Sequence, residues 1–164
     1  MKIALGSDHN GYRMKEELKA FLIEKGHEVT DYGCHSEEAV DYPGVAFAIA
    51  EAISQGKQER GIIVCGTGLG VAIAANKYPG IRAATVHDTY TAERAQLSNN
   101  AQIITLGAQV IGIESAKKAV EAYLNVTFDP ASRSASKVRQ ITDREKELFG
   151  SGKMVEESSR SACS

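Results

Sequence analysis

Short apolar runs alternate with segments of helical period along most of this chain, and this alternation constrains the fold more than any other feature. The runs with the length and character of buried strands cover residues 3–5, 28–32, 61–64, 82–86 and 102–106. Strands separated by helices pair in parallel through right-handed crossovers. The sequence therefore predicts an α/β fold whose five-stranded parallel sheet is covered by helices on both faces.

The segments between these strands repeat apolar residues at the spacing of one helix face. Met14, Leu18 and Leu22 share such a face before Gly26, and Val45, Ile49 and Ile53 share another after Tyr42-Pro43. Two more helices are predicted for about residues 89–98 and 114–124. A last one, from about 132 to 149, is mostly polar and indicates an arm docked on this or another subunit.

The length of 164 residues suits a single domain, which we expect to cover residues 1–149. Residues 150–164 have no period and are rich in small polar side chains, so we expect a disordered tail. The net charge of −2 argues against a nucleic acid or an anionic membrane as partner, because both attract a surplus of Lys and Arg. Any anionic ligand must be bound by a local site.

The N-terminus and the cysteines predict a cytoplasmic protein. The first apolar run is too short for a signal peptide. Cys34, Cys65 and Cys163 are an odd number without metal-ligand spacing, which suits a reducing compartment better than a disulfide framework. We expect no metal site.

The strongest local motif is Cys65-Gly-Thr-Gly-Leu-Gly70, which follows a buried strand and leads into a helix of small residues. Glycines let successive backbone N–H groups point into one concavity, where a phosphate or a developing oxyanion is favoured. The dinucleotide fingerprint is nearly met, but Val71 stands at its last position. A Walker loop is excluded because no Gly-Lys-Ser/Thr follows. A non-catalytic nucleotide-binding module is the alternative.

Cys65 has two interpretations. A cysteine that ends an apolar strand is ordinarily buried packing. Directly before a row of amides, however, a thiolate is stabilised by the same dipoles that bind an anion, which suits a base. No C-x-x-C spacing is present, so a redox role is the weaker hypothesis.

Further polar clusters follow the first and fourth predicted strands. Asp8 and His9 come after the first strand, which the topology puts beside the strand of Cys65. His87 follows the fourth strand, and Ser98 and Asn99 end the next helix; we expect all three at the same edge. The alternatives are helix caps at Asp8 or Asn10, at Asp88, and at Asn99 or Asn100, and a solvent-exposed loop position for His9.

Arg133 and Lys137 stand four residues apart, so both belong to one face of the last helix. Together they would bind a phosphate through charge-assisted hydrogen bonds. A solvated basic face is the alternative.

The motifs G-S-D-H-N-G, D-Y-P, C-G-T-G-L-G and A-A-N-K-x-P-G-I-R-A, with the basic last helix, occur in this order over residues 1–149. In this combination the chain resembles the ribose-5-phosphate isomerase B family, which is related to the galactose-6-phosphate isomerase subunits. The resemblance implies a Rossmann-like α/β/α sandwich with a C-terminal helical arm. It also implies a homodimer or homotetramer with shared active sites, and no cofactor.

The resemblance further assigns roles to individual residues. Cys65 would be the base, Asp8 would assist proton transfer, and Thr67 would hold the enediolate with the backbone amides of Gly66, Gly68, Leu69 and Gly70. The phosphate would be bound by His9, Arg133 and Lys137, with Tyr42 and Asn99 lining the pocket. A base and oriented amides are what an aldose–ketose conversion needs.

Three positions depart from the family pattern. Ser98 replaces a histidine credited with ring opening, Lys137 replaces an arginine, and Gln109 stands where some relatives have another phosphate-binding arginine. His87 is the remaining candidate for ring opening on that edge. The expected reaction interconverts ribose 5-phosphate and ribulose 5-phosphate; erythrose 4-phosphate or a hexose 6-phosphate is the alternative substrate.

Overall fold

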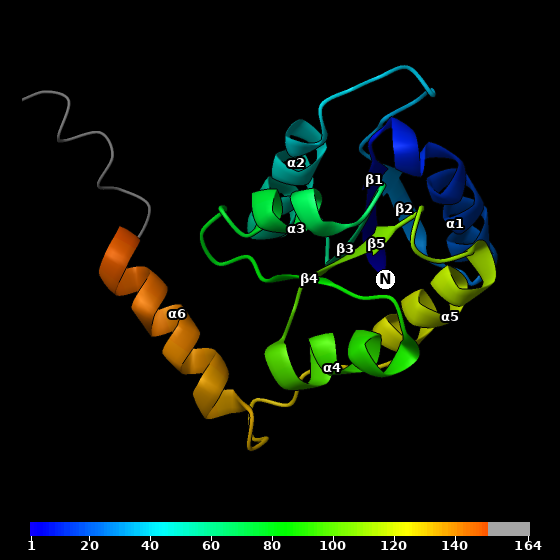
Figure 1. Ribbon diagram of the computed structural model, residues 1–164. Coiled ribbons are helices and arrows are strands. Elements are labelled where there is room, and N and C mark those ends of the chain that lie inside the picture. The colour runs from blue at the N-terminus through cyan, green and yellow to red at the C-terminus, as the bar shows by residue number, and fades with distance from the viewer. Residues whose placement is uncertain (151–164) are drawn as a thin grey trace, which may run out of the picture.

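The computed structural model describes residues 1–150, which form one five-stranded parallel sheet between two layers of helices (Figure 1). The strands are β1 (Lys2–Ser7), β2 (Glu28–Asp31), β3 (Arg60–Cys65), β4 (Ala83–Thr85) and β5 (Ile103–Gly107). Their order across the sheet is β2-β1-β3-β5-β4, and every neighbouring pair is parallel. The predicted α/β class and the five parallel strands are confirmed.

Within residues 1–150, six α-helices and one short 3-10 helix connect and flank the strands. They are η1 (His9–Gly11), α1 (Tyr12–Glu24), α2 (Tyr42–Ser54), α3 (Leu69–Ala75), α4 (Thr89–Asn99), α5 (Ile113–Leu124) and α6 (Ala135–Phe149). No helix of the described residues is long and apolar enough to cross a membrane.

Side chains of the central strand alternate between two cores, because successive residues of a strand point to opposite faces. Ile62 and Val64 join the core under α1, α4 and α5, whereas Ile63 and Cys65 join the core under α2 and α3. Strand β3 is therefore buried on both faces, as its continuous apolar run predicts.

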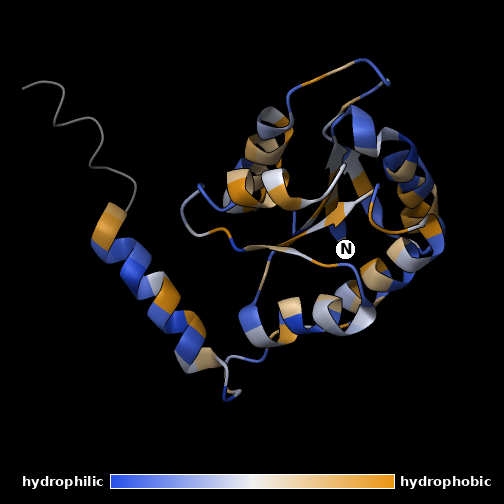
Figure 2. Ribbon diagram, viewed as in Figure 1, coloured by the Kyte–Doolittle hydropathy of each residue, from blue (hydrophilic) through white to orange (hydrophobic). Residues whose placement is uncertain are grey.

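Helix α6 lies apart from the two helical layers, and its surface mixes apolar and polar residues (Figures 1 and 2). Its first turns bury Ala135 and Val138, while Ile141 and Leu148 remain mostly exposed. The predicted arm is thus present in the described part of the chain, with part of its apolar surface uncovered.

Several predicted boundaries differ from those of the structure, and at β4 and α6 the hydrogen bonds give the reason. Strand β4 is shorter than 82–86. The backbone N–H of Arg82 donates to the side chain of Gln102 (2.8 Å), so it does not pair within the sheet. Helix α6 starts three residues later than predicted, because Ser132 and Ala135 form turns that donate to Asp129 and Ser132. Apart from Gly150, the predicted disordered tail lies outside the described residues.

Candidate active site

The Cys65 motif forms a tight turn between β3 and α3. Cys65 is only 5% exposed at the end of β3, and the backbone N–H of Gly68 donates to its Sγ at 3.0 Å. Gly68 adopts a left-handed conformation with φ of 80°, which favours glycine. The N–H of Leu69 donates to Thr67 Oγ1 at 3.2 Å. A thiol, a hydroxyl and backbone amides therefore converge at one strand end.

This turn is held against the residues that follow β5. The N–H groups of Ala108 and Gln109 donate to the carbonyls of Cys65 (2.8 Å) and Gly66 (3.0 Å). At Gly107 any Cβ would lie 2.7 Å from the backbone of Thr67, so only glycine fits this approach. The loop after β5 thus fixes the turn's position.

Two further side chains line the turn. A Cβ on Gly70 would lie 2.6 Å from Cζ of Tyr42, and a Cβ on Gly66 would lie 3.1 Å from Oε1 of Gln109. Tyr42, at the start of α2, is half exposed. The structure therefore brings Tyr42 to the predicted cradle, and it adds Gln109, which the sequence marked only as a departure from the family pattern.

Asp8 lies beside Cys65, as the topology predicts. Its backbone N–H donates to the carbonyl of Val64 at 3.2 Å. Its carboxylate is almost fully buried and accepts a hydrogen bond from the N–H of Gly11 at 3.1 Å, so Asp8 also caps η1. The next residue, His9, accepts from the N–H of Val40 through Nδ1 at 3.2 Å.

His87 lies at the same edge of the sheet. Its Nε2 accepts a hydrogen bond from the N–H of Gly107 at 2.9 Å, and Gly107 pairs with Cys65 across β3 and β5. Because Nε2 is an acceptor here, the imidazole proton is carried on Nδ1. Asp88 accepts from the N–H of Thr91 at 2.7 Å, so the predicted cap at the start of α4 is confirmed.

Ser98 and Asn99 do not lie at that edge, which corrects the sequence expectation. Arg82, just before β4, donates from Nε to the carbonyls of Asn99 (3.1 Å) and Asn100 (3.0 Å). The end of α4 therefore lies at the amino end of β4. The reason is the direction of α4, which starts after β4 and runs back along the sheet for about 16 Å. Asn100 is left-handed and forms the C-terminal cap of this helix.

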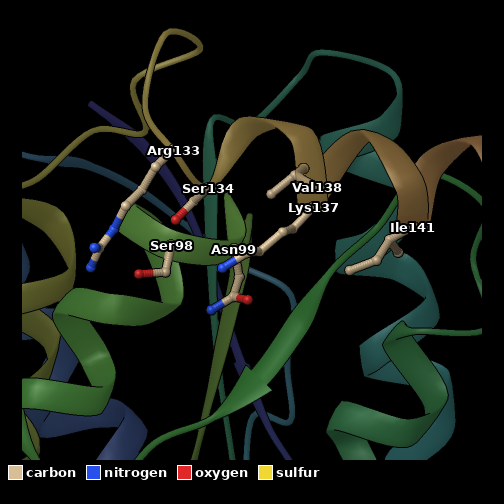
Figure 3. A pocket seen from close by; sticks show the side chains of 7 residues that line it. All are labelled: Ser98, Asn99, Arg133, Ser134, Lys137, Val138 and Ile141. Carbon is tan, nitrogen blue, oxygen red and sulfur yellow. The ribbon is translucent and has the colours of Figure 1, made fainter.

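Ser98 and Asn99 instead share a pocket with Arg133 and Lys137 (Figure 3). The pocket has a volume of about 470 Å³ and is closed on one side by Val138 and Ile141. Arg133 and Lys137 line the same pocket, but Arg133 precedes α6, so the expectation that both lie on one face of the last helix is wrong. One chain thus carries two separate groups of predicted site residues.

A buried lysine anchors the loop that follows β2, next to Asp8. Nζ of Lys15, in α1, contacts the carboxylate of Asp31 at 2.8 and 2.9 Å and donates to the carbonyl of Cys34 at 2.6 Å. Cys34 in turn donates its N–H to the carbonyl of Ser7 at 2.7 Å. Burial opposes ionisation of Asp31, but hydrogen bonds from Lys15, Lys19 and the Gly33 N–H outweigh it and lower its pKa to about 2.

The sequence interpretation missed Lys15 and two threonines, Thr85 and Thr105. The available signal was the same in each case, a polar residue at an apolar position of a helix or strand.

For metals, no group of three or more His, Cys, Asp or Glu residues within 1–150 is arranged to hold an ion.

Known proteins match this chain over nearly all of its described length. The family model described as Ribose/Galactose Isomerase matches residues 3–141. The D-erythrulose-4-phosphate isomerase of Pectobacterium atrosepticum is 49% identical over 142 residues, which are 86% of this chain and 93% of that protein. The ribose-5-P isomerase B of Listeria innocua is 47% identical over 138 residues, 84% of this chain and 93% of that protein.

The solved structures agree with these sequence matches. The structure of Clostridium thermocellum ribose-5-phosphate isomerase B matches with a TM-score of 0.87 and 45% identity, covering 90% of this chain and 99% of that one. The family model, the relatives and the solved structure identify the same family. The chain belongs to the ribose/galactose isomerase family and is an enzyme of its class, a sugar-phosphate aldose–ketose isomerase.

Proposed function

We propose that this enzyme interconverts ribose 5-phosphate and ribulose 5-phosphate through an enediolate, with Cys65 as the base and without a cofactor. The observation that carries this proposal is the hydrogen bond from the Gly68 N–H to Cys65 Sγ at a strand end. A sulfur that accepts from a backbone amide is stabilised as a thiolate, the form that removes a proton. The cytoplasm, expected from the cysteine content, stays a prediction.

The turn also offers groups for the negative charge that develops on the substrate. Thr67 Oγ1 already accepts the N–H of Leu69, so its own proton is free to donate to a substrate oxygen. The thiolate would take the proton from C2 and return it to C1. Asp8, which lies beside the strand of Cys65, would assist the transfer of a proton between the two oxygens. Amides of residues 66–70 would stabilise the enediolate.

The phosphate is bound by cations in this proposal, and these come from a second copy of the chain. Cys65 is at the carboxyl end of the sheet, whereas the pocket of Arg133 and Lys137 adjoins the end of α4 at the amino end of β4. Strand β5 alone spans about 16 Å, which is longer than a pentose phosphate. A single chain therefore cannot offer both groups to one substrate.

A homodimer, or a pair of dimers, would unite the two groups. In it, His9 and the partner subunit's Arg133 and Lys137 would bind the phosphate, and the partner's Asn99 would line the pocket with Tyr42. Exposed apolar side chains lie on both parts of the chain that would meet. Phe47, Leu69 and Ile73 are exposed near the Cys65 turn, and Ile141, Leu148 and Phe149 are exposed on α6. Burying such surfaces stabilises a subunit contact.

Ribose 5-phosphate is the first choice of substrate, and erythrose 4-phosphate is the main alternative. Ser98 stands where many relatives have a ring-opening histidine, and a relative with 49% identity is named for D-erythrulose 4-phosphate. A four-carbon sugar phosphorylated on its fourth oxygen cannot close a furanose ring through that oxygen, so it needs no ring-opening group. Hexose 6-phosphates stay a third candidate, whereas membership of an isomerase family argues against a non-catalytic nucleotide-binding module.

The test is turnover of the wild-type enzyme on ribose 5-phosphate, erythrose 4-phosphate and hexose 6-phosphates, followed by the variant Cys65→Ala. We expect Cys65→Ala to abolish isomerisation and exchange of the C2 proton with deuterated water, while folding and phosphate-ligand binding survive. Cys34→Ala is the matched control, because Cys34 is the other described free thiol and lies outside the turn. Near-normal turnover by Cys65→Ala would exclude the thiol as base.

A further inference from the structure

Two threonine hydroxyls contact the carbonyl oxygen of Gly68, inside the turn that carries Cys65. Thr105 Oγ1 donates to this oxygen at 2.8 Å, and Thr85 Oγ1 lies 3.1 Å from it. The two hydroxyl oxygens are 2.9 Å apart, and the residues are register partners on β5 and β4. Thr105 is completely buried. Side chains of two neighbouring strands therefore meet one backbone carbonyl of the turn.

The two hydroxyl protons serve three oxygen contacts. Thr105 donates to the Gly68 carbonyl, the shorter of the two contacts with that oxygen. Thr85 donates to the same carbonyl or to Thr105 Oγ1. In both arrangements the Thr85 hydroxyl adds to the hydrogen bonding of the carbonyl, directly or by polarising Thr105, so the carbonyl is held more firmly than by one isolated hydroxyl.

Holding this carbonyl fixes the direction of the next amide. A trans peptide unit is planar, so its C=O and N–H point in opposite directions. The carbonyl of Gly68 points toward Thr85 and Thr105 on the sheet. The N–H of Leu69, in the same peptide unit, therefore points away from the sheet and toward Thr67 Oγ1, where it donates at 3.2 Å.

The arrangement differs from that at the starts of α4 and α5. Asp88 and Gly112, the residues before α4 and α5, are extended, and their carbonyls accept the N–H groups of Ala92 (3.1 Å) and Ala116 (3.0 Å). Gly68, the residue before α3, is left-handed, and its carbonyl is met by side-chain hydroxyls. Ordinary helix capping does not require this pair of threonines.

We infer that Thr85 and Thr105 are positioning residues, which hold the Gly68–Leu69 peptide so that its N–H fixes Thr67 Oγ1, whose own proton faces the developing enediolate. The inference rests on the proposed function of the Cys65 turn. Neither threonine touches the substrate. They act on two hydrogen bonds of the turn. One is donated by the Leu69 N–H to Thr67 Oγ1. The other is donated to Cys65 Sγ by the Gly68 N–H, which belongs to the adjoining Thr67–Gly68 peptide unit. Without them this glycine-rich backbone would sample other peptide orientations.

The decisive variant is Thr105→Val, which removes the hydroxyl and keeps the side-chain shape. Losing an oxyanion donor outright lowers kcat by about 10²–10³-fold, and a donor that is only misaligned should cost about 10–10²-fold. We expect this loss in the kcat of Thr105→Val, with a KM that differs from the wild-type value by less than about threefold, because the effect arises in the transition state. Thr85→Val should give a smaller loss in the same direction, and Thr105→Ser should restore most of kcat.

Two ligands separate positioning from a general structural role. A phosphorylated aldonohydroxamate carries charge where the enediolate does, whereas ribitol 5-phosphate has no carbonyl to ionise. Calorimetry on Thr105→Val should show the hydroxamate weakened about 10–10²-fold, in step with kcat, and ribitol 5-phosphate unchanged. Thr30→Val, the same substitution on edge strand β2, is the matched control and should change neither. Equal weakening of both ligands, unchanged kcat, or no rescue by Thr105→Ser would overturn the inference.

Hydrogen exchange tests the same inference without turnover. The amides of residues 66–70 should exchange at least about tenfold faster in Thr105→Val than in the wild type, with the sheet core unchanged. If the wild type isomerises none of the sugar phosphates, the proposed function fails, and this exchange result alone decides whether the threonines hold the turn. Unchanged exchange would show that they do not.

Discussion

Replacing Lys15 by methionine tests whether the loop next to Asp8 is held by a buried charge. The Lys15 side chain is completely buried and contacts Asp31, Glu16 (3.0 Å) and the Cys34 carbonyl. Methionine keeps the unbranched stem and removes the ammonium. Asp31 then retains only Lys19 at 2.9 Å and the N–H of Gly33 at 2.9 Å, and the Cys34 carbonyl loses this donor.

The size of the effect follows from these contacts. Removing one partner of a buried ion pair typically costs about 3–5 kcal/mol. Since Lys19 and Gly33 still contact Asp31, we expect the lower end, about 3 kcal/mol in the free energy of unfolding. For a chain of this size that corresponds to a fall in Tm of roughly 6–12 °C. Lys19→Met is the matched control and should lose less than about 1 kcal/mol, because Lys19 is 30% exposed.

The dependence on pH makes this prediction specific to Asp31. A carboxyl group whose pKa falls from 3.8 in the unfolded chain to about 2 on folding stabilises the fold above pH 4. That contribution, at most about 2 kcal/mol, is lost as pH falls from 4 through 2. In Lys15→Met the pKa of Asp31 lies closer to its ordinary value, so less stability is lost on acidification. The difference between wild type and variant should therefore shrink between pH 6 and pH 2.

Urea unfolding followed by circular dichroism measures this, at one protein concentration and several pH values. A wild-type stability advantage that stays constant from pH 6 to pH 2 would refute the assignment to Asp31. A loss of unfolding free energy in Lys15→Met no larger than that in Lys19→Met would also refute it.

Two further predictions concern the groups that the structure separates. Neutralising Arg133 or Lys137 should weaken sugar-phosphate binding by about 1.5–3 kcal/mol in calorimetry. The control Arg139→Met, on α6 outside the pocket, should leave this binding unchanged. If Arg139→Met weakened binding as much as the other two variants, the three cations would form only a solvated basic face. His87→Ala and His87→Gln should each lower turnover of ribose 5-phosphate by about 10²–10⁴-fold and spare erythrose 4-phosphate. The glutamine retains an acceptor for the Gly107 N–H, so full activity in His87→Gln would reduce His87 to a structural acceptor.

The sheet was predictable because its central strands are short, mainly apolar runs. Strand β3 is buried at every position, and β5 likewise, so length and composition are enough to identify them. Boundaries were less predictable where a side chain takes over a backbone group. Strand β4 starts after Arg82 because Gln102 occupies that N–H, and nothing near Arg82 in the sequence indicates this partner.

The site was predictable where it depends on strand ends and not where it depends on a helix end. Asp8, Cys65 and His87 meet because the carboxyl ends of parallel strands share one edge. Ser98 and Asn99 were expected at that edge too, although a helix that follows a parallel strand runs back to the other end. Their contact with the segment before β4 is a consequence of that direction.

The residues that sequence patterns missed share a physical cause. Lys15 and Thr105 occupy positions that periodicity assigns to apolar core, and both are completely buried. A buried polar group needs a partner, and each finds it in a backbone carbonyl of a loop, Lys15 in Cys34 and Thr105 in Gly68. Those carbonyls lie 19 and 37 residues away in sequence, so no local pattern connects donor and acceptor.

The loop carbonyls of Cys34 and Gly68 explain why the buried polar residues Lys15 and Thr105 lie close to the candidate site. A loop beyond a strand end has carbonyls that the sheet does not satisfy, and a left-handed residue such as Gly68 turns its carbonyl out of the following helix. A side-chain donor from the core satisfies that carbonyl and fixes the loop at once. Arg82, a partly buried residue just before β4, likewise donates to the carbonyls of Asn99 and Asn100 at the end of α4. A polar residue inside an apolar run is therefore a cue to search for the loop that it anchors, even when its partner cannot be identified from the sequence.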